Sequence, residues 1–165
     1  RKRGADILGE IAGFGMSADA KDLTAPDVNG MVRALNGALA DARLNASDVQ
    51  YVNAHGTGTA ANDRTETQAL KATFGNHAKA VPISATKSMI GHALGAAGAL
   101  ELAATLMTLR EGVIPPTINY LGPDPECDLD YVPNEARDAK GYGSRANVGA
   151  FGGLNAVLGV KTYRP

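Results

Sequence analysis

Residues 51–59 read YVNAHGTGT, an apolar run followed by a loop of glycine and threonine. Residues 48–54 form a short apolar segment, which predicts a buried β-strand. That strand delivers the chain to His55, and loops at strand ends are where α/β proteins place their sites. His55 is therefore the first candidate for a functional side chain.

The segments before this strand predict one further strand and one helix. Residues 5–14 are apolar and small and end near the triplet GFG, which predicts a strand that leaves through a turn. From Pro26 to Leu44 apolar residues recur at helical spacing, with Asp27 beside Pro26 as a start signal. This pattern indicates an amphipathic helix on one face of a sheet.

The segments after residue 59 continue the alternation. Asp63, with Glu66 three residues later, predicts the capped start of a helix. Residues 80–84 predict a strand, and Pro82, which has no backbone N–H to donate, indicates either a sheet edge or the beginning of the strand. A nearly all-apolar helix is expected over 94–109, buried on most sides.

The end of the chain predicts two more strands, over 145–150 and 155–163. Strands interleaved with helices of this length argue for an α/β layered fold. With 165 residues, of which 44% are hydrophobic, the chain suits one domain or half of a larger unit. It begins at Arg1 without an initiator Met, which we interpret as a cut from a longer protein.

The net charge and the cysteine content restrict the expected binding partners and the expected cellular location. A formal net charge of -1 gives no electrostatic reason to expect nucleic acid or an anionic membrane. The one cysteine, Cys127, has no internal partner for a disulfide, and no signal peptide is visible, so a cytoplasmic location is expected.

One buried ion pair can be predicted from the apolar helix. Glu101 lies within it, and a buried carboxylate without a partner is costly. Lys87 in the preceding loop is the nearest candidate cation in sequence, so we predict a Lys87–Glu101 pair. Taken alone, Lys87 is more often an exposed loop charge, and a lone loop histidine such as His55 or His92 is more often structural.

Nucleotide and metal chemistry are not expected. The HGTGT loop at 55–59 has neither the lysine of a Walker motif nor the glycine spacing of a Rossmann motif. No cysteine and histidine cluster has zinc spacing, so we predict no metal. His77, in a polar turn, is expected to be structural.

Three motifs in this order resemble the β-ketoacyl-acyl-carrier-protein synthases of the thiolase-like superfamily: HGTGT at 55–59, KSMIGH at 87–92 and FGGLN at 151–155. The resemblance covers essentially all of residues 1–165 and is nearest to the type II, chain-elongating enzymes, with polyketide relatives sharing most of it. It implies the C-terminal half of a five-layered αβαβα fold, whose N-terminal half supplies a nucleophilic cysteine that this chain lacks.

The resemblance also implies roles for individual residues, carried over by their position in the motifs. The implied catalytic residues are His55, Lys87 and His92, and Glu101 would balance the charge of Lys87. Further residues would contact substrate: Thr57 and Thr59 at the phosphopantetheine arm, Phe151 as a gate and oxyanion donor, and Gly152 allowing close approach.

The implied reaction is a decarboxylative Claisen condensation of a malonyl-carrier thioester with an acyl group on the cysteine. The implied partners are an acyl carrier protein and the N-terminal half, within a homodimer of the full enzyme. No cofactor is expected, because the phosphopantetheine arrives on the carrier protein. This chain alone is expected to be inactive.

One departure and three rival interpretations accompany the resemblance. Elongating enzymes usually have Phe where this chain has Gly149, which leaves the acyl-pocket shape open. A non-catalytic chain-length factor is the main rival, although such subunits typically lose the catalytic histidines. An isolated binding domain is a second. A degradative thiolase is a third, and it fails because its C-terminal cysteine is missing here.

Overall fold

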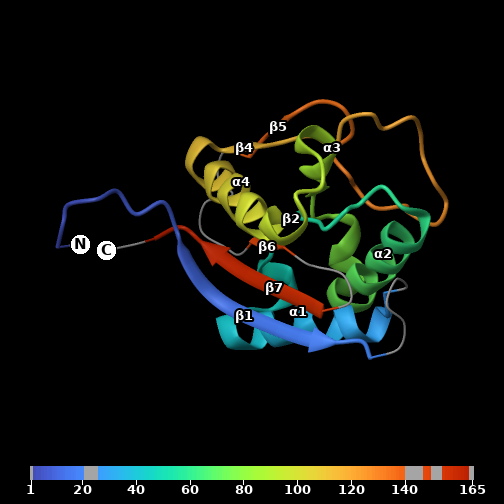
Figure 1. Ribbon diagram of the computed structural model, residues 1–165, viewed down its shortest axis with the longest axis horizontal. Coiled ribbons are helices and arrows are strands. Elements are labelled where there is room, and N and C mark those ends of the chain that lie inside the picture. The colour runs from blue at the N-terminus through green and yellow to red at the C-terminus, as the bar shows by residue number, and fades with distance from the viewer. Residues whose placement is uncertain (1, 21–25, 140–146, 150–153, 164–165) are drawn as a thin grey trace.

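The computed structural model describes residues 2–20, 26–139, 147–149 and 154–163, with 147–149 as backbone only. Helices cover both faces of a five-stranded sheet, which confirms the predicted α/β architecture (Figure 1). The strands are β1 (Glu10–Ala18), β2 (Tyr51–Asn53), β3 (Ile83–Ser84), β4 (Val113–Ile114), β5 (Arg137–Asp138), β6 (Asn147–Gly149) and β7 (Leu154–Lys161). The α-helices are α1 (Val28–Ala42), α2 (Ala60–Phe74), α3 (Lys87–Ile90) and α4 (Ala97–Glu111), and short 3₁₀ helices span Ala46–Asp48, Gly75–Lys79 and Leu94–Ala96.

The main sheet has the strand order β1-β7-β6-β2-β3, while β4 and β5 form a separate pair. β2 runs parallel to β3 and β6, and β7 runs antiparallel to β6 and β1. β3 is an edge strand directly after Pro82, as predicted. Because the carboxyl ends of parallel strands meet at one edge of a sheet, the loops after β2 and β3 lie together.

The main hydrophobic core lies between the sheet and the pair α1 and α2. The GFG triplet is part of β1, so the predicted turn there is wrong. A Cβ atom at Gly13 would lie 2.4 Å from the Ala38 carbonyl oxygen, and one at Gly15 would lie 1.9 Å from that of Ala34. These glycines let the backbone of α1 rest directly on the strand.

Helix α4 lies on the opposite side of the sheet from α1 (Figure 1). Its buried side chains are mainly polar, at Glu101, Thr105 and Thr108, whereas Leu100 and Met107 are each 43% exposed. The expectation that this helix is buried on most sides is therefore wrong for this chain. The inward side of α4 thus carries hydrogen-bonding side chains, of which Thr105 lies 3.4 Å from Asn53 of β2.

Candidate active site

His55 and Lys87 leave the ends of neighbouring parallel strands. Asn53 at the end of β2 pairs with Ser84 at the end of β3, so both loops start at the same level. The Lys87 Nζ atom lies 3.1 Å from His55 Nδ1, and both residues are buried. The two loops therefore bring a lysine and an imidazole into contact.

The predicted Lys87–Glu101 ion pair is confirmed. Lys87 Nζ donates a hydrogen bond to Glu101 Oε1, and the two side chains are only 5% and 4% exposed. Burial raises the pKa of Glu101 to about 7, and the hydrogen bond and charge of Lys87 oppose that rise. The pair joins α3 to α4, because Lys87 is the first residue of α3 and not part of a loop as predicted.

His92 completes a cluster of two imidazoles and one lysine. Its ring meets that of His55 edge to face, with ring centroids 5.4 Å apart and an interplanar angle of 87°. The Leu94 N–H donates to His92 Nδ1 at 3.1 Å, so the neutral His92 ring carries its proton on Nε2. Unlike His55, His92 is exposed in this chain.

The environment of His55 keeps its ring uncharged. Burial lowers the pKa of His55 to about 4, and the nearby charges of Lys87 and His92 act in the same direction. An ammonium group at Lys87 donates to His55 Nδ1, so the proton of the neutral ring sits on Nε2. Both imidazoles thus adopt the same tautomer.

Sequence reasoning missed the role of Glu66. Its two carboxylate oxygens accept the backbone N–H groups of His55 at 2.8 Å and Gly56 at 2.9 Å. Burial raises the pKa of Glu66, while those hydrogen bonds oppose the rise. Glu66 therefore fixes the backbone that carries His55.

The predicted capping pair at the start of α2 is wrong. Helix α2 begins at Ala60 with Thr59 as its N-cap, and the Asn62 N–H donates to Thr59 Oγ1 at 3.4 Å. The sequence offered only a weak signal for Glu66, an acidic residue in the second turn of a helix that follows a glycine-containing loop. The Glu66 carboxylate accepts hydrogen bonds from the loop at His55 and Gly56 and not from the start of the helix.

The remaining residues implied by the resemblance fall into two groups. Thr57 and Thr59 lie side by side, with their hydroxyl oxygens 2.8 Å apart in a hydrogen bond. Phe151 and Gly152 lie outside the described residues, so their predicted roles have no structural account here. His77, expected to be structural, has its Nε2 atom 2.7 Å from the Val49 carbonyl oxygen. This contact lies outside the cluster of His55, Lys87 and His92.

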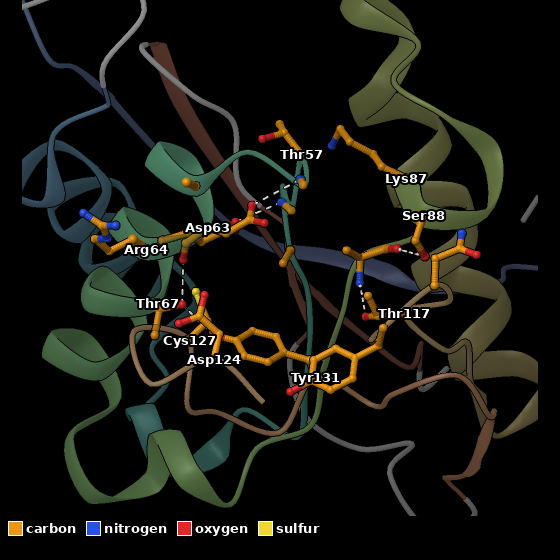
Figure 2. A pocket seen from close by; sticks show the side chains of 18 of the residues that line it. Thr57, Asp63, Arg64, Thr67, Lys87, Ser88, Thr117, Asp124, Cys127 and Tyr131 are labelled. Carbon is orange, nitrogen blue, oxygen red and sulfur yellow. Dashed lines mark hydrogen bonds between the residues drawn. The ribbon is translucent and has the colours of Figure 1, made fainter. Parts of the chain in front are cut away.

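A pocket of about 760 Å³ opens beside the cluster, with Lys87 and His92 in its lining. Figure 2 shows Lys87 and Thr57 at one end and Tyr131 at the other. Cys127 also lines it, and burial raises the pKa of that thiol, which is the wrong direction for a nucleophile. The lining thus combines hydroxyl groups and the ammonium group of Lys87 with the carboxylates of Asp63, Asp124 and Glu126.

The described ranges, 2–20, 26–139, 147–149 and 154–163, contain neither a group of metal-binding side chains nor a helix that could span a membrane. No three histidine, cysteine, aspartate or glutamate side chains in them are grouped so as to hold a metal ion. None of their helices has the length and apolar content needed to cross a bilayer.

Comparison with known proteins decides the family. Residues 8–121 match the family described as "Beta-ketoacyl synthase, C-terminal domain". The chain belongs to the β-ketoacyl synthase family. Its fold is that of the C-terminal, thiolase-like half of a ketosynthase, as the sequence motifs predicted.

The chain is similar to proteins with several different names. The chain is 57% identical to "Nodulation protein E" of Rhizobium sp. (strain N33) over 94% of its own length and 39% of that protein. It is 49% identical to "3-oxoacyl-[acyl-carrier-protein] synthase 2" of Synechocystis sp. (strain ATCC 27184 / PCC 6803 / Kazusa), over 98% of its own length and 39% of the relative. A solved type II polyketide ketosynthase in complex with its acyl-carrier protein superposes with a TM-score of 0.92 at 38% identity, covering 99% of this chain and 40% of that one. The chain therefore spans about two fifths of the length of the relatives it matches.

Proposed function

We propose that this chain is the catalytic C-terminal half, residues 1–165, of a β-ketoacyl-acyl-carrier-protein synthase, and that His55 and His92 stabilise the charge formed during decarboxylation. The observation that carries the proposal is that the Nδ1 atom of each ring lies at hydrogen-bond distance from a nitrogen donor, from which the same tautomer follows for both rings. His55 Nδ1 faces Lys87 and His92 Nδ1 accepts from the Leu94 N–H, so each ring presents a donor at Nε2.

The chemistry needs two such donors. When the bond from the malonyl methylene carbon to its carboxylate breaks, carbon dioxide leaves and negative charge spreads onto the thioester oxygen. Two neutral imidazole N–H groups aimed at that oxygen stabilise the charge without accepting a proton. A histidine with an ordinary pKa of 6.5 would be partly cationic near neutral pH, whereas that of His55 is lowered to about 4.

The carbanion then forms the new carbon–carbon bond. Its electron pair attacks the carbonyl carbon of an acyl group held on the cysteine of the N-terminal half. The carbon–sulfur bond breaks, the cysteine leaves as thiolate, and the β-ketoacyl product remains on the carrier. No step of this reaction needs a cofactor, because the phosphopantetheine arm is part of the carrier protein.

The proposed partners follow from that reaction. The carrier's arm would enter beside Thr57 and Thr59, whose hydroxyl groups stand at the loop that follows His55. Phe151 and Gly152 would complete the acyl side. We further propose that the full enzyme is a cytoplasmic homodimer. Support for the carrier comes from a similar ketosynthase that was solved with its acyl-carrier protein.

The test uses the full-length protein that contains this segment. Acyl-carrier and malonyl-carrier protein are mixed with it, and mass spectrometry follows condensation. We expect the β-ketoacyl product from the unmutated protein and its loss in His55→Ala. The product should be retained in His77→Gln, a control at the histidine of this chain that is not proposed to be catalytic. Acyl loading without decarboxylation or condensation in the unmutated protein would instead favour a chain-length-factor-like partner.

A further inference from the structure

Asn53 connects the two halves of the buried ion pair. Its side chain is fully buried between the loop after β3 and helix α4. The Thr86 hydroxyl donates to Asn53 Oδ1 at 3.2 Å, and Asn53 Nδ2 donates to the Glu101 carbonyl oxygen at 3.1 Å. Thr86 immediately precedes Lys87 in the chain. One amide group therefore ties the neighbour of Lys87 to the backbone of Glu101.

The orientation of this amide is fixed by chemistry. The Glu101 carbonyl can only accept a hydrogen bond, so the NH₂ group of Asn53 must face it and the oxygen must face Thr86. Asn53 Nδ2 also lies 3.4 Å from Thr105 Oγ1, one turn further along α4. Since these bonds are buried, a side chain that lacked one of them would leave an unsatisfied polar group.

We propose that Asn53 and Thr86 are positioning residues that hold the Lys87–Glu101 pair at the spacing needed for Lys87 to keep the His55 ring in its Nε2–H tautomer. This inference rests on the proposed function. A lysine side chain has four rotatable bonds, so its contact with His55 depends on where its backbone and its carboxylate partner are fixed. Asn53 fixes both.

The competing explanation is that these bonds merely attach α4 to the sheet. A matched comparison lies beside these bonds, because the buried Tyr51 hydroxyl lies 2.6 Å from Ser84 Oγ within the sheet and also hydrogen-bonds Thr108 of α4. Neither contact includes a neighbour of Lys87 or the backbone of Glu101. Tyr51→Phe thus removes a buried hydroxyl at this interface without cutting the Asn53 connection.

The experiment compares Thr86→Val, Thr86→Ser and Tyr51→Phe in the full-length protein. Thr86→Val keeps the shape of the side chain and removes the hydroxyl, whereas Thr86→Ser keeps the hydroxyl. For decarboxylation of malonyl-carrier protein, we expect Thr86→Val to lower kcat about tenfold with KM within about twofold, as for an interaction that acts in the transition state. Thr86→Ser and Tyr51→Phe should stay within about twofold of wild type, although Tyr51→Phe should lower the melting temperature.

A second readout reports the His55 ring directly. ¹⁵N chemical shifts of labelled histidine distinguish the two neutral tautomers, and comparison with His55→Ala assigns the signal. We expect one Nε2–H tautomer in wild type, Thr86→Ser and Tyr51→Phe, and a mixture in Thr86→Val. Asn53→Asp, which turns an oxygen toward the Glu101 carbonyl, should also give a mixture.

The two readouts separate this inference from the proposed function. An unmutated protein that neither decarboxylates nor condenses would overturn the proposed function, while the tautomer in Thr86→Val would still decide whether Asn53 and Thr86 position the ring. An active protein in which Thr86→Val keeps a single tautomer, or changes kcat no more than Tyr51→Phe does, would overturn the positioning role alone.

Discussion

His55 is held at three points by three different side chains. Glu66 binds its backbone N–H, Lys87 meets its Nδ1 atom, and the His92 ring lies against it edge to face. Glu66 belongs to α2, whereas Lys87 and His92 belong to the KSMIGH motif at 87–92, and only the fold brings both segments to His55. The result is an imidazole with a fixed position, a fixed tautomer and no charge.

The first prediction concerns the titration of His55. Because burial is the largest cause of its lowered pKa, His55 should remain neutral from pH 7 down to about pH 5. In Lys87→Met the pKa should rise from about 4 but stay below 6.5, since the charge of Lys87 is removed and burial remains. Histidine NMR titration of the full-length protein measures both values. An unchanged pKa in Lys87→Met would contradict the contact between the two side chains.

A contact between single residues could be predicted from the sequence only where leaving a group without a partner would cost much free energy. A carboxylate in an apolar helix requires a cation, so the partnership of Lys87 and Glu101 could be predicted from the sequence alone. Glu66 and Asn53 could not be predicted in the same way, because they bind backbone groups, and every residue supplies those. The roles of Thr57, His55 and His92 came from motif resemblance, whereas their contacts depend on how distant segments pack.

At the scale of elements, β1 and α1 show why the GFG segment at 13–15 was wrongly predicted as a turn. Two glycines so close together in sequence favour a turn, yet Gly13 and Gly15 lie within β1 under α1. The distinction depends on what packs over the strand, which a single sequence does not contain. The helical spacing over 26–44, in contrast, is a property of the segment itself, and α1 forms within that range.

The second prediction tests this contact. Gly15→Ala places a Cβ atom 1.9 Å from the Ala34 carbonyl oxygen, so α1 must move away from the strand. We expect a loss of about 3 kcal/mol or more in the free energy of unfolding, typical of overpacking against backbone. Urea unfolding followed by circular dichroism measures it.

Gly37 in α1 provides the matched control. A Cβ atom there has its nearest neighbour at 3.4 Å, an ordinary contact, and alanine favours the helix. Gly37→Ala should therefore leave the protein as stable or stabilise it by about 0.5–1 kcal/mol. A Gly15→Ala protein that is as stable as the unmutated one would show that α1 does not rest on Gly15.

The third prediction concerns the inverted faces of α4. Thr108 is buried and Met107 is half exposed, although apolar residues usually occupy the inner side. For this chain alone, Met107→Gln should reduce self-association and leave the melting temperature unchanged, because no packed core is lost. Light scattering and thermal unfolding test the two parts. A fall in melting temperature would show that Met107 is packed within the chain itself.

At the scale of the whole molecule, several large apolar side chains among the described residues lie on uncovered surfaces. Leu100 and Met107 of α4, Ile90 of α3, and Phe14 and Met16 of β1 are each at least 43% exposed. Exposed apolar surface of this kind marks an interaction site. The five-layered fold proposed for the full enzyme supplies a partner for it.

The fourth prediction follows from those surfaces. This chain alone should self-associate, and mixing with a separately produced N-terminal half should yield a defined complex that is active in condensation. Analytical ultracentrifugation and mass spectrometry measure the two effects. A monodisperse monomer that ignores the N-terminal half would contradict the proposed division of the enzyme.

Helix α4 also has a consequence for how the protein tolerates mutation over evolutionary time. On most helices, the inward positions accept one apolar residue for another and reject polar ones. On α4, Glu101 and Thr105 face inward, so an exchange of Thr105 for the similarly shaped valine removes the hydroxyl that accepts from Asn53. Selection on this helix should therefore preserve side chains that form hydrogen bonds at the inward positions. At the outward positions Leu100 and Met107, it should preserve side chains that fit the surface packed against them in the full enzyme.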